Sequence, residues 1–166
     1  MLRMFHTGEG EGGMSDTTAA AAPHEELLSA LEALATSNAH VTGLLASSLG
    51  IGPSDLRALF FIARGRGEAT PKRTAEFLEL STGATTSVLD RMADAGFIVR
   101  RPNPTDRRSI CLALAPSGET AIERILGIFN RALDAAVSPQ DAPAIAAAFR
   151  AIGDALVRVA EEELGA

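Results

Sequence analysis

The chain has 166 residues, enough for one domain whose hydrophobic core needs no disulfide. Hydrophobic residues make up 46%, charged residues 22% and aromatic residues 4%, which excludes a disordered chain and favours a soluble, mostly helical protein. The net charge of -6 excludes a polybasic nucleic-acid coat, although residues 56–108 alone hold ten basic and six acidic side chains, a surplus of +4.

The N-terminal segment and the single cysteine point to a cytoplasmic protein. Residues 1–22 hold Gly-Glu repeats and an alanine run without an apolar face, so we expect a disordered tail, and Met14 is an alternative native start. One cysteine, Cys111, excludes an internal disulfide and a cysteine-based zinc site. No apolar stretch approaches the roughly 18 to 20 residues that span a bilayer, so no membrane partner and no cofactor are expected.

Helices with apolar seams are predicted in both terminal regions, residues 23–52 and 115–166, and such seams need a partner helix. Spacings of four and three predict that they mediate dimerisation, with Asn38 as a register-setting polar residue. The helix that carries the second seam is expected to start near Ser138, although Pro143 leaves its boundary open. The predicted dimerisation residues are Leu27, Leu31, Leu34, Asn38, Ile145, Phe149, Ile152 and Leu156.

The basic centre, residues 53–114, predicts a winged helix-turn-helix. One helix runs from Pro53 to Arg64, and a second follows Pro71. A third ends at Gly96 and has an inner face of Ala84, Val88, Leu89 and Met92. Residues 97–101 and 109–114 are β-branched or apolar and flank a turn-rich loop, which predicts a β-hairpin. The fold class is therefore mainly α with a small β-hairpin wing (α+β).

The third helix has the composition of a DNA recognition helix. Short hydroxyl side chains fit into a major groove, where they donate to or accept from base edges, and the positive helix end favours phosphate. The alternative is that they only cap the helix and cover a solvated surface. The predicted contacts are Thr82, Thr85, Thr86, Ser87 and Arg91.

The wing and the preceding helix supply further candidate DNA contacts. Arg107 and Arg108 stand at the tip of a proline-stiffened loop and suit the electronegative minor groove. Asp106 could orient a neighbouring arginine, or form an ordinary Asx turn. Lys72 and Arg73 begin the preceding helix, where phosphate contact and plain solvation are both reasonable.

These segments resemble the MarR (multiple antibiotic resistance regulator) family of winged-helix transcription factors. The resemblance lies in residues 78–92 (LELSTGATTSVLDRM), 95–101 (AGFIVRR), 106–109 (DRRS) and 114–118 (LAPSG). It implies a homodimer with interlocking terminal helices, with Arg107 in the minor groove and Asp106 as its orienting partner. The sequence departs from the family at Ser87, where a long basic residue is frequent, at Thr74, usually apolar, and at Phe77, commonly polar.

The resemblance also implies a small aromatic or anionic effector that lowers DNA affinity. A pocket of His40, Phe60 and Arg64 is conceivable, and the alternative places His40 at an interface and the phenylalanines in the core. Some relatives sense oxidants through a cysteine, but Cys111 lies on a wing strand and is expected to be structural.

No enzymatic motif is present. The three histidines have no metal-ligand spacing with Cys111, and no Gly-x-Ser-x-Gly occurs. We therefore predict a homodimeric transcriptional regulator, a repressor by occlusion, that binds double-stranded DNA at a two-fold symmetric operator. The alternative is a winged-helix dimer that contacts proteins instead of DNA.

Overall fold

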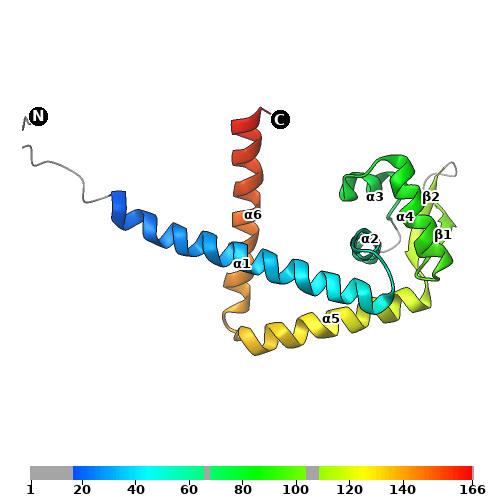
Figure 1. The fold of residues 1–166 in the computed structure, drawn as a ribbon, viewed down its shortest axis with the longest axis horizontal. Helices are drawn as coiled ribbons and strands as arrows, with labels where there is room; N and C mark the ends of the chain where they lie inside the picture. The colour runs from blue at the N-terminus through cyan, green and yellow to red at the C-terminus, as the bar shows by residue number, and fades with distance from the viewer. Residues whose placement is uncertain (1–16, 66–67, 104–108, 166) are drawn as a thin grey trace, which may run out of the picture. The chain divides into compact units, whose positions relative to one another are not determined.

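The computed structural model describes residues 17–65, 68–103 and 109–165, in two units, Met1–Pro53 and Ser54–Ala166. The first unit contains one long helix, α1 (Thr17–Leu49), shown in blue to cyan in Figure 1. This helix includes residues 17–22, which are the last six residues of the predicted disordered tail. The alanine run lacks an apolar face, but alanine has the highest helix propensity and so extends the helix.

The predicted seam of α1 is largely uncovered within the single chain. The side chains of Leu27 and Leu34 are 45% and 51% exposed, and Asn38 is also exposed. Leu31 is half-buried. Exposed apolar side chains in a stripe are typical of a protein interaction surface, because a large apolar surface is unfavourable in water.

The second unit begins with three helices that form the predicted helix-turn-helix. They are α2 (Pro53–Arg64), α3 (Pro71–Leu78) and α4 (Thr82–Asp94). The side chain of Thr70 accepts a hydrogen bond from the amide of Arg73 and caps α3, and Ser81 caps α4 in the same way. Glu79 ends α3 in the left-handed conformation at φ 56°, which makes the turn between the two helices tight.

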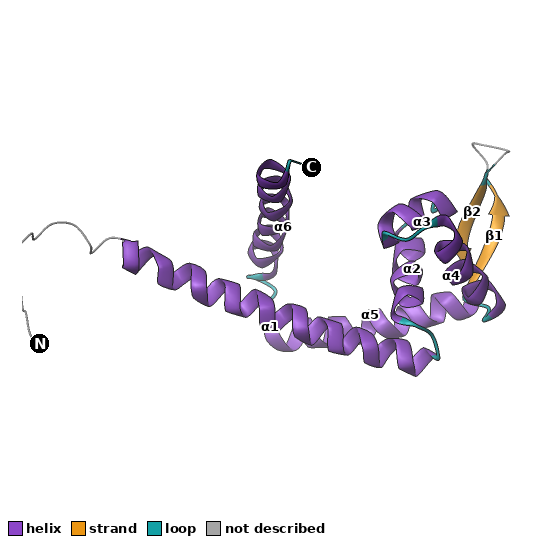
Figure 2. Cartoon of the chain, turned by 45° about the horizontal axis from the view of Figure 1, so that its top comes forward, coloured by secondary structure: helices purple, strands orange, loops and turns teal. Residues whose placement is uncertain are grey.

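The predicted β-hairpin is present and lies beside α4 (Figure 2). Strands β1 (Ile98–Pro102) and β2 (Ile110–Leu114) pair antiparallel, with Ile98 opposite Leu114. Ala69 forms an isolated bridge with Leu112 and accepts a hydrogen bond from its amide. Gly96 has φ +75° and so allows the sharp turn from α4 into β1.

The core of this unit forms where α2, α3, α4, the hairpin and the start of α5 (Pro116–Ala136) meet. Gly118 of α5 lies so close to the carbonyl oxygen of Phe97 that no side chain fits there. Ser117 donates a hydrogen bond to the carbonyl of Gly96, which joins α5 to the end of α4. The largest fully buried side chains are Leu56, Leu59, Ile62, Thr74, Leu89, Met92, Ile98, Leu112 and Ile125.

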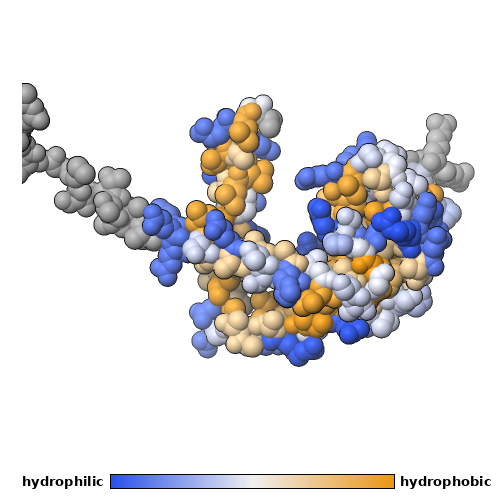
Figure 3. Space-filling model, viewed as in Figure 1, coloured by the Kyte–Doolittle hydropathy of each residue, from blue (hydrophilic) through white to orange (hydrophobic). Residues whose placement is uncertain are grey.

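Helix α6 (Ala142–Leu164) starts four residues later than Ser138, where the sequence placed its cap. The Ser138 hydroxyl donates to the Asp141 carboxylate and accepts from the Asp141 backbone amide, but these bonds close a separate turn. Pro143 lies in the first turn of the helix itself. No residue of α6 is buried. Figure 3 shows apolar side chains along α6. The side chains of Phe149 and Leu156 in this helix are 49% and 63% exposed.

The structure confirms the predicted fold class. Its described residues form six helices and one two-stranded hairpin. Among these helices, none combines the length and the apolar character needed to cross a membrane.

Candidate nucleic-acid interface

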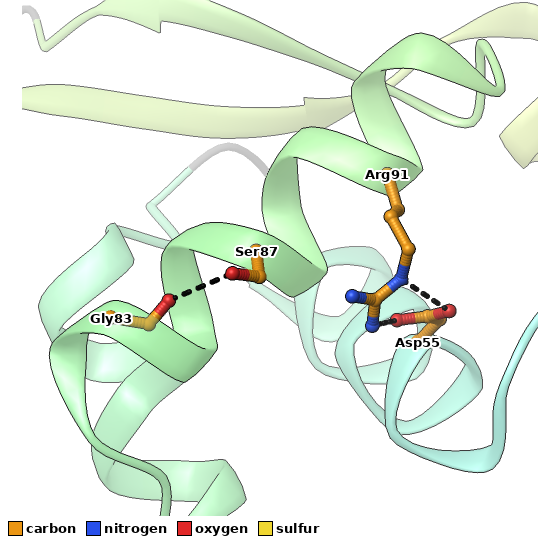
Figure 4. A network of polar contacts seen from close by, with 4 residues as sticks. All are labelled: Asp55, Gly83, Ser87 and Arg91. Carbon is orange, nitrogen blue, oxygen red and sulfur yellow. Dashed lines mark hydrogen bonds and ion pairs between the residues drawn. The ribbon is translucent and has the colours of Figure 1, made fainter.

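The first turns of α4 carry exposed hydroxyl groups. Thr82, Thr86 and Ser87 are exposed, and the last two donate to backbone carbonyls four residues earlier, over 2.9 Å and 3.1 Å. Figure 4 shows the bond from Ser87 to Gly83. Since the hydroxyl protons of Thr86 and Ser87 are used in bonds within the helix, only the lone pairs of their oxygens are available to an external partner. In this arrangement the hydroxyls of Thr86 and Ser87 are left as hydrogen-bond acceptors, and their contact with DNA stays a prediction.

The structure corrects the prediction for Thr85, which was expected to face DNA. Its side chain is only 2% exposed, and its hydroxyl donates to the carbonyl of Ser81 over 3.0 Å. Ala84, expected on the inner face, is exposed instead. The rest of the predicted inner face is confirmed, because Val88, Leu89 and Met92 are buried. Thr85 takes the inner position of the first turn because a threonine whose hydroxyl is satisfied locally can be buried.

Arg91 is held by α2. Its guanidinium donates to both carboxylate oxygens of Asp55, over 2.6 Å and 3.4 Å, as Figure 4 shows. The Asp55 side chain is only 5% exposed, whereas that of Arg91 is 58% exposed. The hydrogen bond and charge of Asp55 raise the pKa of Arg91 above its usual value. Arg91 thus connects α4 to α2, and its contact with DNA stays a prediction.

Sequence reasoning missed Asp55 as part of this site. The Pro-Ser-Asp segment marked only the start of α2, and the two partners are 36 positions apart. In the structure Asp90 pairs with Arg100 of β1, so α4 is tied to the wing as well as to α2.

The ends of the wing loop are fixed by Asn103 and Ser109. The Asn103 amide group donates to the Ser109 hydroxyl over 2.8 Å, and their backbones are also hydrogen bonded. Asp106, Arg107 and Arg108, the predicted wing contacts, lie outside the described residues.

Lys72 and Arg73 lie in the first turn of α3, and both are exposed. Lys72 stands 3.9 Å from the carboxylate of Glu76, an exposed pair that holds it weakly. Their cationic groups stand near the positive end of the helix, where an anion is favoured. Phosphate contact therefore remains a prediction that the geometry permits.

The predicted ligand pocket is only partly reproduced. Arg64 lines a hollow between α2 and α3, but the aromatic residues there are Phe61 and Phe77, not Phe60. His40 belongs to the first unit, whereas the residues that line this hollow belong to the second. Cys111 is a buried free thiol on β2. Its burial agrees with a structural role, because redox sensors require access to solvent.

Comparison with known proteins shows a family similarity in the segment that carries this interface. Residues 49–109 match the MarR family. The multiple antibiotic resistance protein MarR of Salmonella typhimurium is 36% identical over 78 residues, 47% of this chain and 54% of that protein. The uncharacterized HTH-type transcriptional regulator YcgE of Bacillus subtilis is 33% identical over 67 residues, which cover 40% of this chain and 43% of that protein. The chain thus spans about half the length of these curated relatives.

Solved structures show the same fold. A MarR transcriptional regulator from Methanosarcina mazei matches with a TM-score of 0.61 at 19% identity, over 81% of this chain and 99% of that one. An S. aureus MepR mutant bound to an oligodeoxyribonucleotide matches with a TM-score of 0.55 at 16% identity, over 78% and 97%. The curated relatives are named as regulators and not as enzymes. Together with the capped helix-turn-helix and the hairpin, these matches support a winged-helix transcriptional regulator that is similar to the MarR family.

Proposed function

We propose that the chain is a sequence-specific DNA-binding regulator that represses transcription as a homodimer on a pseudo-palindromic operator in the cytoplasm. The observation that carries the proposal is the exposed hydroxyl face of Thr82, Thr86 and Ser87 at the start of α4. A tight turn joins α4 to α3, whose first turn is cationic. A helix N-terminus with short polar side chains is the part of a recognition helix that contacts base edges.

The charge distribution supports DNA as the partner. Residues 56–108 have a surplus of +4 although the whole chain has a net charge of -6. Phosphate binding by this segment releases counterions, so the affinity should fall steeply with salt. The acidic remainder is better suited to lie away from the duplex.

Exposed apolar side chains on α1 and α6 support the homodimer. They are uncovered in the single chain, and a second copy would bury the same surface on both partners. Two recognition helices would then read half-sites about one helical turn apart. Release from DNA by a small aromatic ligand completes the proposal.

A DNA titration tests the proposal. The purified protein is titrated against fragments of DNA from upstream of its own gene, with random DNA as competitor. We expect a specific complex that survives the competitor, weakens by about tenfold or more in Arg107→Ala, and weakens less in Ser87→Ala. Arg158→Gln, an exposed change on α6, is the control and should behave as the wild type.

The opposite result would favour the protein-interaction alternative. If the wild type has no preference over random DNA, or if Arg107→Ala binds the specific site as tightly as the wild type, the DNA-binding proposal is wrong. A winged-helix dimer that contacts proteins would then be the better account.

A further inference from the structure

Two rows of exposed residues run along α4, because residues four apart on a helix lie on the same side. The rows are Thr82, Thr86 and Asp90, and Gly83, Ser87 and Arg91. In each row the first two residues are small and uncharged, and only the last is charged. Ala84, which is also exposed, adds a methyl group beside the second row. The first two turns of α4 therefore present only small, uncharged side chains to the major groove.

The charged residue at the end of each row is paired with another element. The Arg91 guanidinium donates to Asp55 of α2 over 2.6 Å, and the Asp90 carboxylate accepts from Arg100 of β1 over 2.5 Å. An arginine reads guanine by donating two bonds from its planar guanidinium to the O6 and N7 atoms of the base. Because a carboxylate holds each of these two guanidiniums, neither is free to turn to a guanine edge.

A hollow between α3 and α4 adds further acceptors to this face. Thr82 and Thr86 line it together with Glu76 and Glu79. Among the described residues, the cation in its wall is Lys72, whose ammonium nitrogen is 3.9 Å from a carboxylate oxygen of Glu76. Since the major-groove edge of guanine consists of two acceptors, carboxylates beside the groove disfavour guanine there.

The small side chains of α4 combine hydrogen-bond acceptors with an apolar contact. The hydroxyls of Thr86 and Ser87 donate to the carbonyls of Thr82 and Gly83, over 2.9 Å and 3.1 Å, so their oxygens offer lone pairs to a base amino group. The exposed methyl group of Ala84 suits the methyl group of thymine. Nothing else in the described residues lies within 4 Å of the place where a side chain of Gly83 would begin, so a base edge can approach the helix closely there.

We propose that α4 reads A·T base pairs in the major groove. The N6 amino group of adenine donates to the oxygen of Thr86 or Ser87, and the C5 methyl group of thymine packs on Ala84. A G·C pair also presents an amino group, on cytosine, but it lacks the methyl group and adds the two acceptors of guanine. These acceptors would lose water without gaining a donor from α4. The inference rests on the proposed function and specifies which bases the operator presents to this helix.

Base analogues in a selected operator test the proposal. The full chain first selects its operator from a duplex library of random sequence, and each base of a half-site is then replaced in turn. Purine removes the amino group of adenine, deoxyuridine removes the methyl group of thymine, and 7-deazaguanine removes N7 of guanine. All three analogues keep the minor-groove atoms, so contacts of the wing are not altered. We expect purine and deoxyuridine to weaken binding by about three- to tenfold at one or more positions, and 7-deazaguanine by less than about twofold.

Matched variants assign the amino contact to a side chain. Thr86→Val keeps the shape of the side chain and removes its oxygen, and Ser87→Ala removes the other oxygen; both residues are exposed, so folding should be retained, which circular dichroism checks. In one of these variants the penalty for purine should fall below about twofold. Thr120→Val on α5 is the control and should keep the full penalty, because Thr120 is exposed and its hydroxyl donates in the same way to the carbonyl four residues earlier, over 3.0 Å. Purine also loses a Watson–Crick bond, but this loss is common to all variants and cancels in the comparison.

The outcomes separate this inference from the proposed function. An operator that loses affinity with 7-deazaguanine, or that tolerates both purine and deoxyuridine, would overturn the inference while specific DNA binding stands. A penalty for purine that both Thr86→Val and Ser87→Ala retain would overturn it as well, because neither oxygen would then accept from adenine. If the full chain enriches no sequence from the library, the proposed function is wrong, and this inference fails with it.

Discussion

The side chain of Arg91 stands on the recognition helix but is directed to Asp55 of α2, over 2.6 Å. We predict that it positions α4 and is not itself a phosphate contact. Arg91→Gln and Asp55→Asn should each weaken specific DNA binding by about tenfold, because either change releases α4 from α2. The double variant should be no weaker than the single ones, since one interaction is lost in all three.

The salt dependence of binding separates the two roles of Arg91. A phosphate contact contributes about one unit to the slope of log affinity against log salt, so its loss in Arg91→Gln alone would lower that slope. A positioning role leaves the slope unchanged in both variants. A lower slope in Arg91→Gln with a normal slope in Asp55→Asn would therefore contradict our assignment.

Gly118 is the position where the backbone of α5 meets the end of α4. A Cβ there would collide with the carbonyl oxygen of Phe97, which is backbone and cannot move aside freely. Gly118→Ala should lower the free energy of unfolding by about 1–3 kcal/mol. Gly127→Ala on the same helix meets only the far end of Arg131, and should raise it by up to about 1 kcal/mol through helix propensity. Urea unfolding of both variants measures the difference, and equal stability would contradict the close approach.

At the scale of elements, the sequence predicted those features that depend on local chemistry. The proline at the start of α2, the serine and threonine caps and the β-branched strand β1 all act within a few residues, and the corresponding elements are present. The inner position in the first turn of α4 was assigned to Ala84 instead of Thr85, because a hydropathy pattern favours alanine and takes no account of a hydroxyl that is satisfied locally. The bond between Asp55 and Arg91 left no local signal, because it joins residues from different helices.

The burial of Thr85 in α4 can be tested with one matched pair of substitutions. Thr85→Ser removes a methyl group that is buried, so it should lower the free energy of unfolding by about 1 kcal/mol. Thr86→Ser removes a methyl group that is exposed, so stability should be unchanged. Both variants keep the hydroxyl that bonds to the preceding turn. If thermal unfolding placed the loss in Thr86→Ser instead, the burial of Thr85 would be contradicted.

At the scale of the whole molecule, α6 is a helix that the single chain leaves without cover. Ile145, Phe149, Ile152 and Leu156 share one face at spacings of four and three, and none of them is buried. Because a two-fold partner would cover this face, Phe149→Asp should raise the dimer dissociation constant by at least about tenfold. Sedimentation at several protein concentrations measures the shift.

The control for this change is Arg158→Asp, which also adds an acidic residue to α6 but on the face away from the apolar stripe. It should remain dimeric. If the dimer is the DNA-binding unit, Phe149→Asp should also weaken operator binding, and binding should recover at protein concentrations where the variant dimerises again. A variant that stays monomeric yet binds the full operator as tightly as the wild type would separate assembly from recognition, and would show that each recognition helix acts on its own.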